Sequence, residues 1–469
     1  MTRRLLSYFA LTIKYLTIGV ATILLVVACN SDTQIRNDNV VRTISDTDTL
    51  QLWWDKGYTP EEDEALQELV KIWERDTGHK VQINFYTLDQ RSEKPQRYLQ
   101  GGETPDIFMS FKAESTLNAT LAWDGKLVDV TDIIEPVKEI FEPQALATAS
   151  YYNNVEKKQS YYAVPIHRAA LHIYYWKDLI EKTGRTSADI PRDWDGFWQF
   201  WLDVAADLET EQQQDIYPIG LPMSIEAGDT YQAFEHVLEA YNVRLIDEEG
   251  NLLVDDPQVR QGIIQCLDWY TSFYLQGHTP QDAVDWNNAA NNQKILNREI
   301  LTTTNATLSI PAALRQDMDA YRDRLGIVEL PNKPDGEAMK HIFLVEQAVI
   351  FKDAANPQLA KEFLAYLIQP EVINTFLQES GRHSPAHTSV YEDAYWTNPE
   401  DPHTSTVTKT LTQSEIRSIY PGNSPAYSVV LKENIWGQSL ENIVLKNVSP
   451  EQAADKAIAR IKEIFAQWK

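Results

Sequence analysis

The chain has 469 residues, of which 43% are hydrophobic and 10% aromatic, and this is enough for two or three globular domains with sizeable cores. It carries 42 basic and 68 acidic residues, which gives a formal net charge of −26. Nucleic acid and anionic membrane surfaces repel so acidic a chain, and we expect neither as a partner.

The first 28 residues are predicted to be a signal peptide rather than part of the fold. Arg3 and Arg4 form a basic start, and the apolar run that follows is strongest over residues 15–27 and stops just before Cys29. A small residue followed by a cysteine at this point resembles the bacterial lipoprotein signal. The resemblance implies cleavage before Cys29 and a lipid such as palmitate on that cysteine, which would hold the protein on the cell membrane, facing the periplasm or the exterior. An ordinary signal peptide or a single membrane anchor is the alternative, and the two arginines leave the general and twin-arginine export routes open.

Residues 29–48 are polar and contain few large apolar side chains, so they are predicted to form a flexible tether. Cys266 is the only other cysteine and lies in an apolar helical stretch. We expect it to be a small buried hydrophobic residue, because acylation of Cys29 would leave it no disulfide partner.

Ordered structure is predicted to begin with three strands, at residues 49–54, 80–86 and 104–110, separated by helices. The first helix covers 61–77 and is expected to end at Gly78. A strand–helix–strand–helix–strand order predicts a parallel sheet with right-handed crossovers. Ligands of such sheets bind beyond the carboxyl ends of the strands.

The run from Tyr161 to Asp178 is rich in β-branched and aromatic residues, with Pro165 near its start. We interpret it as the chain leaving one lobe and entering a second. A long helix follows from about residue 191, with Asp193 as its expected N-cap. Further helices are predicted at 177–183, 233–241, 257–274, 357–368, 370–380 and 450–467, and further strands at 217–222, 301–308, 326–330 and 341–351.

Several short motifs follow one another along the chain. They are Trp53-Trp54 after the first strand, Trp73 to Val81, Pro105-Asp106, Gly125 to Thr131, Tyr162 to Leu179, Pro191 to Phe197, Asn356 to Leu367 and Ser449 to Asp455. Together they resemble family 1 of the extracellular solute-binding proteins of bacterial ABC importers, the maltodextrin-binding type. Each motif alone has little specificity, and the resemblance depends on their collinear order over residues 49–469.

The resemblance implies an α/β fold of the type II periplasmic-binding-protein class, in which two lobes, each a mostly parallel sheet flanked by helices, are joined by a hinge that the chain crosses about three times. We expect the N-terminal lobe to contain residues 49–165 and about 302–342. The C-terminal lobe would contain residues 166–301 and about 343–469. The resemblance also implies a monomer that captures a solute, in the first place a sugar or oligosaccharide, between its lobes and delivers it to the transmembrane subunits of an ABC permease.

A sugar site needs aromatic faces for the apolar side of the ring and polar groups for its hydroxyls. Of the two adjacent tryptophans we expect Trp54 to be exposed and Trp53 to lie in the core. The candidate ligand-binding residues are Trp54, Tyr58, Asp89, Ser110, His167, Arg168, Trp286, Asn288, Asn305, Glu346 and Trp436. Core packing, a solvated loop or, for Arg168, an ion pair between the lobes is the alternative at these positions.

Neighbouring strand residues point to opposite faces, so at most one of His167 and Arg168 is expected to line the cleft. His167 and His172 also face opposite sides and make a poor metal pair, and we expect neither a metal nor a cofactor. Glu346 and Gln347 stand where the family usually has small residues, which leaves the usual ligand in question.

No sequence motif of a metalloprotease, serine hydrolase, thiol redox protein, P-loop or dinucleotide-binding protein is present. We therefore expect a binding protein rather than an enzyme. Two alternatives stay open: the same scaffold binding a charged solute (a phosphorylated polyol, a polyamine or an opine), and a surface polysaccharide hydrolase. A hydrolase would need two carboxylates facing one cleft.

Overall fold

The computed structural model of the chain describes residues 49–86, 104–213, 215–247, 250–418 and 424–468. The expected signal peptide, the tether and Asp89 lie outside these residues. Among the helices that the structure describes, none combines the length and the apolar character needed to cross a membrane.

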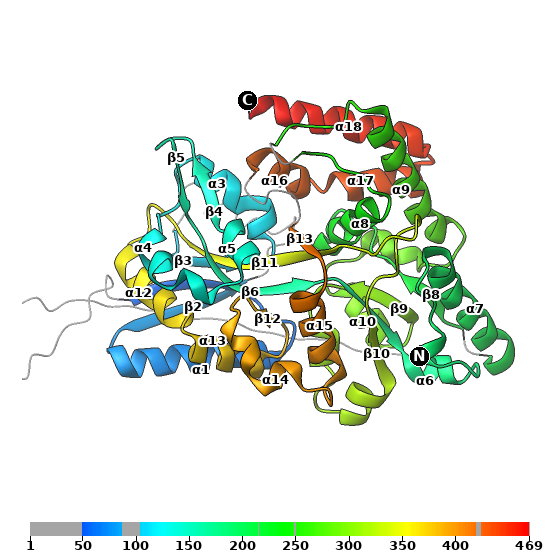
Figure 1. The fold of residues 1–469 in the computed structure, drawn as a ribbon, viewed down its shortest axis with the longest axis horizontal. Coiled ribbons are helices and arrows are strands. Elements are labelled where there is room, and N and C mark those ends of the chain that lie inside the picture. Colours follow the sequence, from blue (N-terminus) through cyan, green and yellow to red (C-terminus); the bar gives the residue numbers. More distant parts are fainter. Residues whose placement is uncertain (1–48, 87–103, 214, 248–249, 419–423, 469) are drawn as a thin grey trace, which may run out of the picture. The chain divides into compact units, whose positions relative to one another are not determined.

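Two β-sheets organise the described chain (Figure 1). The first has the strand order β12-β6-β11-β3-β1-β2, with β13 paired to β11. Its strands are β1 (Thr49–Asp55), β2 (Lys80–Tyr86), β3 (Ile107–Ser110), β6 (Val164–Ala170), β11 (His341–Ile350), β12 (Ser384–Pro385) and β13 (Ile416–Ser418). β1 runs parallel to both β2 and β3, as predicted from the strand–helix order. β11 runs antiparallel to β3 and β6.

The second sheet has the order β10-β7-β9-β8. Its strands are β7 (His172–Trp176), β8 (Tyr217–Gly220), β9 (Ile300–Asn305) and β10 (Leu325–Val328). A separate hairpin pairs β4 (Ser150–Asn153) with β5 (Lys158–Tyr161).

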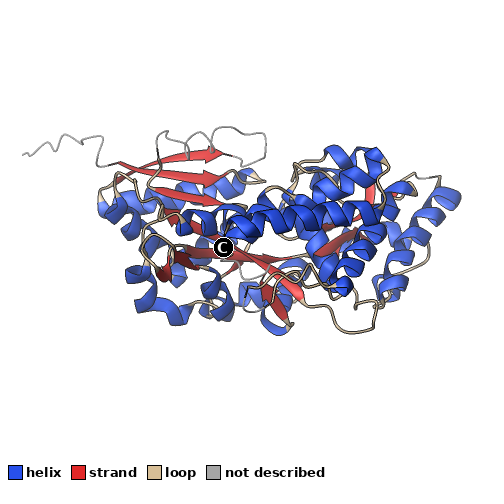
Figure 2. Ribbon diagram, turned by 90° about the horizontal axis from the view of Figure 1, so that it is seen from above, coloured by secondary structure: helices blue, strands red, loops and turns tan. Residues whose placement is uncertain are grey.

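Helices lie along both sheets (Figure 2), and each sheet has a hydrophobic core of its own. The helices beside the first sheet include α1 (Pro60–Thr77), α4 (Thr131–Ile134), α5 (Pro143–Thr148), α12 (Pro357–Leu367), α13 (Pro370–Ser380), α14 (Ala394–Thr397) and α15 (Pro402–Gln413). Those of the second core are α6 (Lys177–Glu181), α7 (Trp194–Gln212), α8 (Gly228–Ala240), α9 (Pro257–Leu275), α10 (Ala290–Leu296), α16 (Pro425–Lys432), α17 (Ile435–Lys446) and α18 (Pro450–Gln467). The π-helix η2 (Glu114–Asn118) and α3 (Ala119–Trp123) carry a third, smaller cluster, and α11 (Ser309–Ala312) follows β9.

Local signals at the helix ends behave as the sequence predicts. Gly78 follows α1 with φ of 77°, a left-handed conformation that glycine adopts without steric cost. Asp193 accepts a hydrogen bond from the Gly196 backbone N at 2.9 Å and so caps α7. Cys266 is fully buried in the core of the second sheet.

Over residues 161–178 the chain runs from the first sheet to the second, although β6 continues in the first sheet beyond the expected boundary at residue 165. β6 belongs to the first sheet and β7 to the second, and only Leu171 separates them. The chain returns to the first sheet between β10 and β11. It leaves that sheet again after β13, because α16 packs in the core of the second. The chain thus passes between the sheets three times over the residues that the structure describes.

The expected division into lobes differs from the sheets in its later segments. Residues 302–342 were expected with the N-terminal lobe, but β9 and β10 pair with β7 in the second sheet. Residues from 343 onward were expected with the C-terminal lobe, but β11 lies between β3 and β6 in the first sheet. Strand membership depends on pairing between distant segments, and the hydrophobic pattern of one strand does not identify its partner.

Candidate functional site

Asp55 lies at the carboxyl end of β1, where the end of β3 meets it. Its carboxylate accepts hydrogen bonds from the Ser110 hydroxyl at 3.3 Å and from the Phe111 backbone N at 3.1 Å. Burial raises the pKa of Asp55 to about 6, against the opposing effects of the Phe111 hydrogen bond, Arg382 and Lys112. The edge at which the sequence predicts ligand binding therefore holds a buried carboxyl group with cations nearby.

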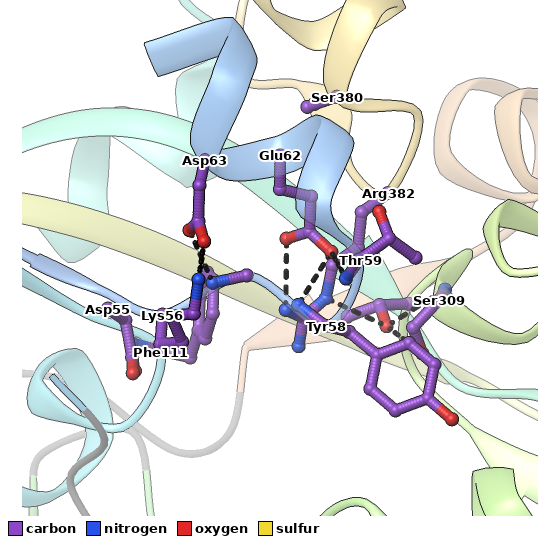
Figure 3. A network of polar contacts seen from close by, with 12 residues as sticks. Asp55, Lys56, Tyr58, Thr59, Glu62, Asp63, Phe111, Ser309, Ser380 and Arg382 are labelled. Carbon is purple, nitrogen blue, oxygen red and sulfur yellow. Dashed lines mark hydrogen bonds and ion pairs between the residues drawn. The ribbon is translucent and has the colours of Figure 1, made fainter. Parts of the chain in front are cut away.

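Tyr58 follows Asp55 in a loop whose backbone is held by the first turn of α1 (Figure 3). The Glu62 carboxylate accepts from the backbone N of Tyr58 at 2.8 Å and of Thr59 at 3.1 Å, and Asp63 accepts from the Gly57 backbone N at 3.0 Å. The Tyr58 ring is half-buried and points away from Glu62 (Figure 3). A fixed backbone with a partly exposed ring offers a surface for stacking at little cost in conformational entropy.

Arg382, which follows α13, reaches the same loop. Its Nη1 lies 3.1 Å from Glu62 Oε2, and its guanidinium stacks over the Phe111 ring at 4.3 Å. Its Nε donates to the Thr307 hydroxyl at 3.5 Å. These contacts fix a cation beside Tyr58 and Asp55.

The N-terminus of α8 supplies groups from the side of the second sheet. Asn288 Oδ1 accepts from the Gly228 backbone N at 2.6 Å and from the Asp229 backbone N at 3.4 Å, and so caps the helix. Burial raises the pKa of Asp229 to about 6, against the charges of Lys112 and Arg382, which come from the side of the first sheet. Charged groups of the two sides therefore interact here.

A direct hydrogen bond also joins the two sides. The Ser115 hydroxyl in η2 lies 2.9 Å from the Tyr231 hydroxyl in α8. We call the following residues the strand-end site: Asp55, Tyr58, Ser110, Lys112 and Arg382 on the side of the first sheet, with Asp229 and Asn288 on the side of the second. It combines an aromatic ring, an amide, two carboxyl groups and two cations, a set that can bind polar solutes.

Of the predicted site residues, the structure brings Tyr58, Ser110 and Asn288 together in the strand-end site. The prediction that Trp54 is exposed is wrong. In β1 the side chains of Leu50, Leu52 and Trp54 point into the core, and the Trp54 ring lies 6.2 Å from Phe376. Trp53 is the half-buried one, because helices α1 and α13 cover the opposite face of the strand.

Arg168 is 1% exposed and does not reach the strand-end site. Its Nε donates to the Pro385 carbonyl at 3.1 Å and to the Tyr391 hydroxyl at 3.3 Å, and its Nη1 lies 3.5 Å from Glu142. The alternative of an ion pair is correct, but all three partners lie beside the first sheet rather than across the two sheets.

Trp286, Trp436 and Asn305 are buried and bonded elsewhere. Trp286 Nε1 donates to Asp282 at 3.1 Å, and Trp436 Nε1 donates to Glu235 at 3.2 Å. The Asn305 amide donates to the Thr307 carbonyl and the Ser309 hydroxyl. These side chains stabilise the second core and the turn after β9. Their aromatic rings and amide groups, which suggested ligand contact, contact other parts of the protein instead.

His167 and Glu346 are buried against each other in the first sheet, with His167 Nδ1 3.0 Å from Glu346 Oε2.

Sequence reasoning missed four members of the strand-end site. Asp55 is the last residue of β1 and Lys112 lies two residues beyond β3, so both lie at strand ends, which is the signal that identified Ser110. Arg382 and Asp229 carry no such local signal, because only the tertiary structure brings their segments to the ends of β1 and β3.

The sequence model that describes bacterial extracellular solute-binding proteins matches residues 56–373, more than half of the chain. The chain belongs to this family. The suspected relationship is thus confirmed, and membership implies a location outside the cytoplasm for this solute-binding protein. No curated protein sequence matches it.

Solved structures of solute-binding proteins share its fold. A protein of Thermotoga lettingae bound with α-D-tagatose has a TM-score of 0.72 and 18% identity, and the match covers 89% of this chain and 99% of the other. Maltose-bound MalE3 of T. maritima has a TM-score of 0.71 and 18% identity, covering 88% and 100%. The GacH receptor of Streptomyces glaucescens, solved without ligand and with acarbose, has a TM-score of 0.68 and 15% identity, covering 90% and 100%. The predicted fold class, a type II periplasmic-binding-protein-like α/β fold, is confirmed. The expectation that each sheet is mostly parallel is wrong, because β11 runs antiparallel to β3 and β6 and β7 runs antiparallel to β9 and β10.

Proposed function

We propose that this solute-binding protein is the extracytoplasmic receptor of an ABC importer and that it captures a sugar or oligosaccharide in the strand-end site. The observation that carries the proposal is the meeting, in one place, of Tyr58, Asp55 and Arg382 beside the first sheet with Asp229 and Asn288 beside the second. A sugar ring stacks on an aromatic face, and its hydroxyls pair with carboxylate and amide groups. The bound tagatose, maltose and acarbose of proteins with this fold support a carbohydrate as the solute class.

The mechanism that we propose is conformational rather than catalytic. A ligand that contacts both sides stabilises a closed form over an open one, and the permease recognises the closed form. The Ser115–Tyr231 hydrogen bond is a contact of the closed form, because it joins η2 to α8 across the two sheets. Turnover of an oligosaccharide, measured as new reducing ends, would contradict a purely binding role.

Calorimetric titration of the purified protein with a panel of mono- and oligosaccharides tests the proposal. We expect at least one sugar to bind with a single site. Tyr58→Ala and Asp229→Asn are each expected to weaken it about tenfold or more, the equivalent of about 1.4 kcal/mol. Tyr152→Ala, at an exposed tyrosine of β4, is the matched control and should leave the affinity unchanged. A panel without a binding sugar, or equal affinities in all variants, would overturn the proposal.

A charged solute is the second candidate, and the two cations favour it. Lys112 and Arg382 both act on Asp55 and on Asp229. Guanidinium and ammonium groups recognise phosphate and carboxylate. The same panel, extended to sugar phosphates, polyamines and opines, separates the candidates. An anion that binds more tightly than every neutral sugar, with an affinity that falls as salt rises, would replace the sugar assignment.

We further propose that the mature protein begins at Cys29 and is anchored to the membrane through lipid on that residue. The supporting observation is the position of Cys29 directly after the apolar run. Cells that express the full chain and are fed a labelled palmitate analogue should yield a labelled protein in the membrane fraction. Cys29→Ala is expected to lose the label, and a labelled variant or an unlabelled wild type would exclude the lipid.

A further inference from the structure

Three buried side chains of types that bind metals converge in the first sheet, beside the strand-end site. His167 in β6 and Glu346 in β11 are paired residues of adjacent antiparallel strands. His383 lies just before β12, which pairs with β6 on its other side. One potential ligand atom from each of the three residues lies within 4.8 Å of those of the other two, and all three side chains are buried. We call these residues the His–Glu–His cluster.

Ordinary structural pairing accounts for only part of this cluster. His167 Nδ1 is paired with Glu346 Oε2 at 3.0 Å, while the ring of His383 stacks on that of His167 with centroids 3.8 Å apart. Nε2 of His383 is buried and has no hydrogen-bond partner among the described residues. A buried polar atom without a partner costs about 1–3 kcal/mol, so its retention requires an explanation.

A small cavity adjoins the cluster. His167 and His383 line it together with Trp54, Asp55, Phe111 and the first turn of α1. Its volume of about 10 Å³ corresponds to roughly one water molecule. There is thus room beside the two imidazoles for one small additional ligand.

We propose that His167, Glu346 and His383 bind a divalent transition-metal ion, with Zn²⁺ the ion that suits the donors best. Two imidazoles and one carboxylate are a known donor set of zinc, and such sites leave a fourth position for water. Zinc ligands at about 2.0–2.2 Å from the ion lie about 3.3 Å from one another, which is closer than the widest spacing here. Metal binding would therefore draw the three side chains closer together than they lie in this structure.

The charges around the cluster suit a cation. Glu114 in η2 lies close enough to Glu346 for the two carboxyl groups to interact electrostatically. Arg382 is the opposing charge next to His383, but it is held against Glu62. A bound dication would offset the buried Glu346 carboxylate and give His383 Nε2 the lone-pair acceptor that it lacks.

The position of the cluster gives the metal a consequence for solute binding. His383 is the neighbour of Arg382, a member of the strand-end site. A metal that ties His383 to the central strands β6 and β11 therefore fixes the loop that presents Arg382 to the solute. The metal site itself does not depend on the identity of the solute, so the two proposals fail separately.

The test uses the full-length chain, purified without a histidine tag, treated with a chelator and titrated with Zn²⁺ in a calorimeter. We expect one equivalent to bind. His383→Gln and Glu346→Gln should each weaken Zn²⁺ binding about 100-fold or more, because each removes one of the three ligands. His172→Gln, at an equally buried histidine bonded outside the cluster, is the matched control and should leave Zn²⁺ affinity unchanged.

Two further measurements show whether a loss of Zn²⁺ binding comes from loss of the site or from misfolding, and what coordination the ion has. Circular dichroism identifies any variant that fails to fold, and the wild-type chain loaded with Co²⁺ should show the intense visible bands of a four-coordinate ion. Absence of a single tight Zn²⁺ site in the wild type overturns the proposal. Equal Zn²⁺ affinity in the wild type and in both folded cluster variants also overturns it, because the ion would then bind acidic groups of the surface.

Discussion

At the scale of single residues, several histidines are buried in the neutral form. His403 in α15 is fully buried, and its Nε2 donates to the Tyr321 carbonyl at 2.7 Å. Burial lowers its pKa to about 4, although the hydrogen bond to Tyr321 and the nearby Asp401 act in the opposite direction. His172 and His387 behave alike, with pKa values lowered to about 4 chiefly by burial. Proton uptake by these rings is therefore linked to unfolding.

The direction in which pH changes stability follows from the histidine pKa values in the folded and unfolded states. An unfolded histidine titrates near pH 6.5, so between about pH 6.5 and 4 the unfolded chain binds more protons than the folded one. The free energy of unfolding should fall as the pH is lowered through this window and level off below it. For His403 the full effect is about 3 kcal/mol, from a shift of about 2.5 units.

We predict that His403→Gln makes stability less dependent on pH. Glutamine cannot ionise, so the loss in unfolding free energy between pH 7 and 4.5 should shrink by about 2 kcal/mol. Urea unfolding at a series of pH values measures this loss in the wild type and in the variant. His278→Gln makes the same substitution at a half-buried position and is the control for the substitution itself. If both variants flatten the profile equally, burial of His403 is not the cause.

At the scale of elements, α17 shows how one side chain joins a helix to a distant loop. Asn434 precedes the helix in a left-handed conformation with φ of 45°, and its Oδ1 accepts from the Gly437 backbone N at 3.1 Å. Its Nδ2 donates to the carbonyls of Ile225 at 2.8 Å and Ala227 at 3.1 Å, in the loop that leads into α8. Asn434 thus ties the N-terminus of α17 to the loop that precedes the strand-end site residue Asp229.

We predict that Asn434→Ala destabilises the protein by about 2–3 kcal/mol, from the lost cap and the unpaired buried carbonyls. Asn447→Ala is the matched control at the other end of α17. Asn447 has φ of 54°, so both substitutions place alanine in the left-handed region, but Asn447 is exposed. Denaturant unfolding should give a larger loss for Asn434→Ala by about 1–2 kcal/mol, and equal losses would show that backbone strain alone is responsible.

At the scale of the whole molecule, three passages connect the two sheets in the part of the chain that the structure describes, and the first two lie next to the His–Glu–His cluster. β6 and β11 carry His167 and Glu346 of the His–Glu–His cluster and adjoin the first two crossing segments. The first passage could be located from the sequence, because Pro165 and the aromatic run interrupt the helical pattern there. The later two were misplaced, since the sequences of β9, β10 and β11 do not show which strands they pair with.

The candidate site, like the passages between the sheets, could be predicted only in part from the sequence. Ser110 ends one parallel strand and Tyr58 lies just beyond another, and the rule that ligands bind at carboxyl ends identifies them without a structure. Trp54 shows the limit of that rule. Alternation in β1 requires that Trp53 and Trp54 face opposite ways, but which face becomes the core depends on where α1 and α13 pack.

The sequence by itself determined the local features of this solute-binding protein: the first three strands, the caps at Gly78 and Asp193, the first passage between sheets and the family. These follow from steric and hydrogen-bonding preferences of residues near one another in the chain. Only the tertiary structure decided that Arg382 and Asp229 meet beside Asp55, and that His383 joins His167 and Glu346. Such meetings depend on long-range strand pairing and helix packing, whose free energy comes from burial of whole faces rather than from any short pattern.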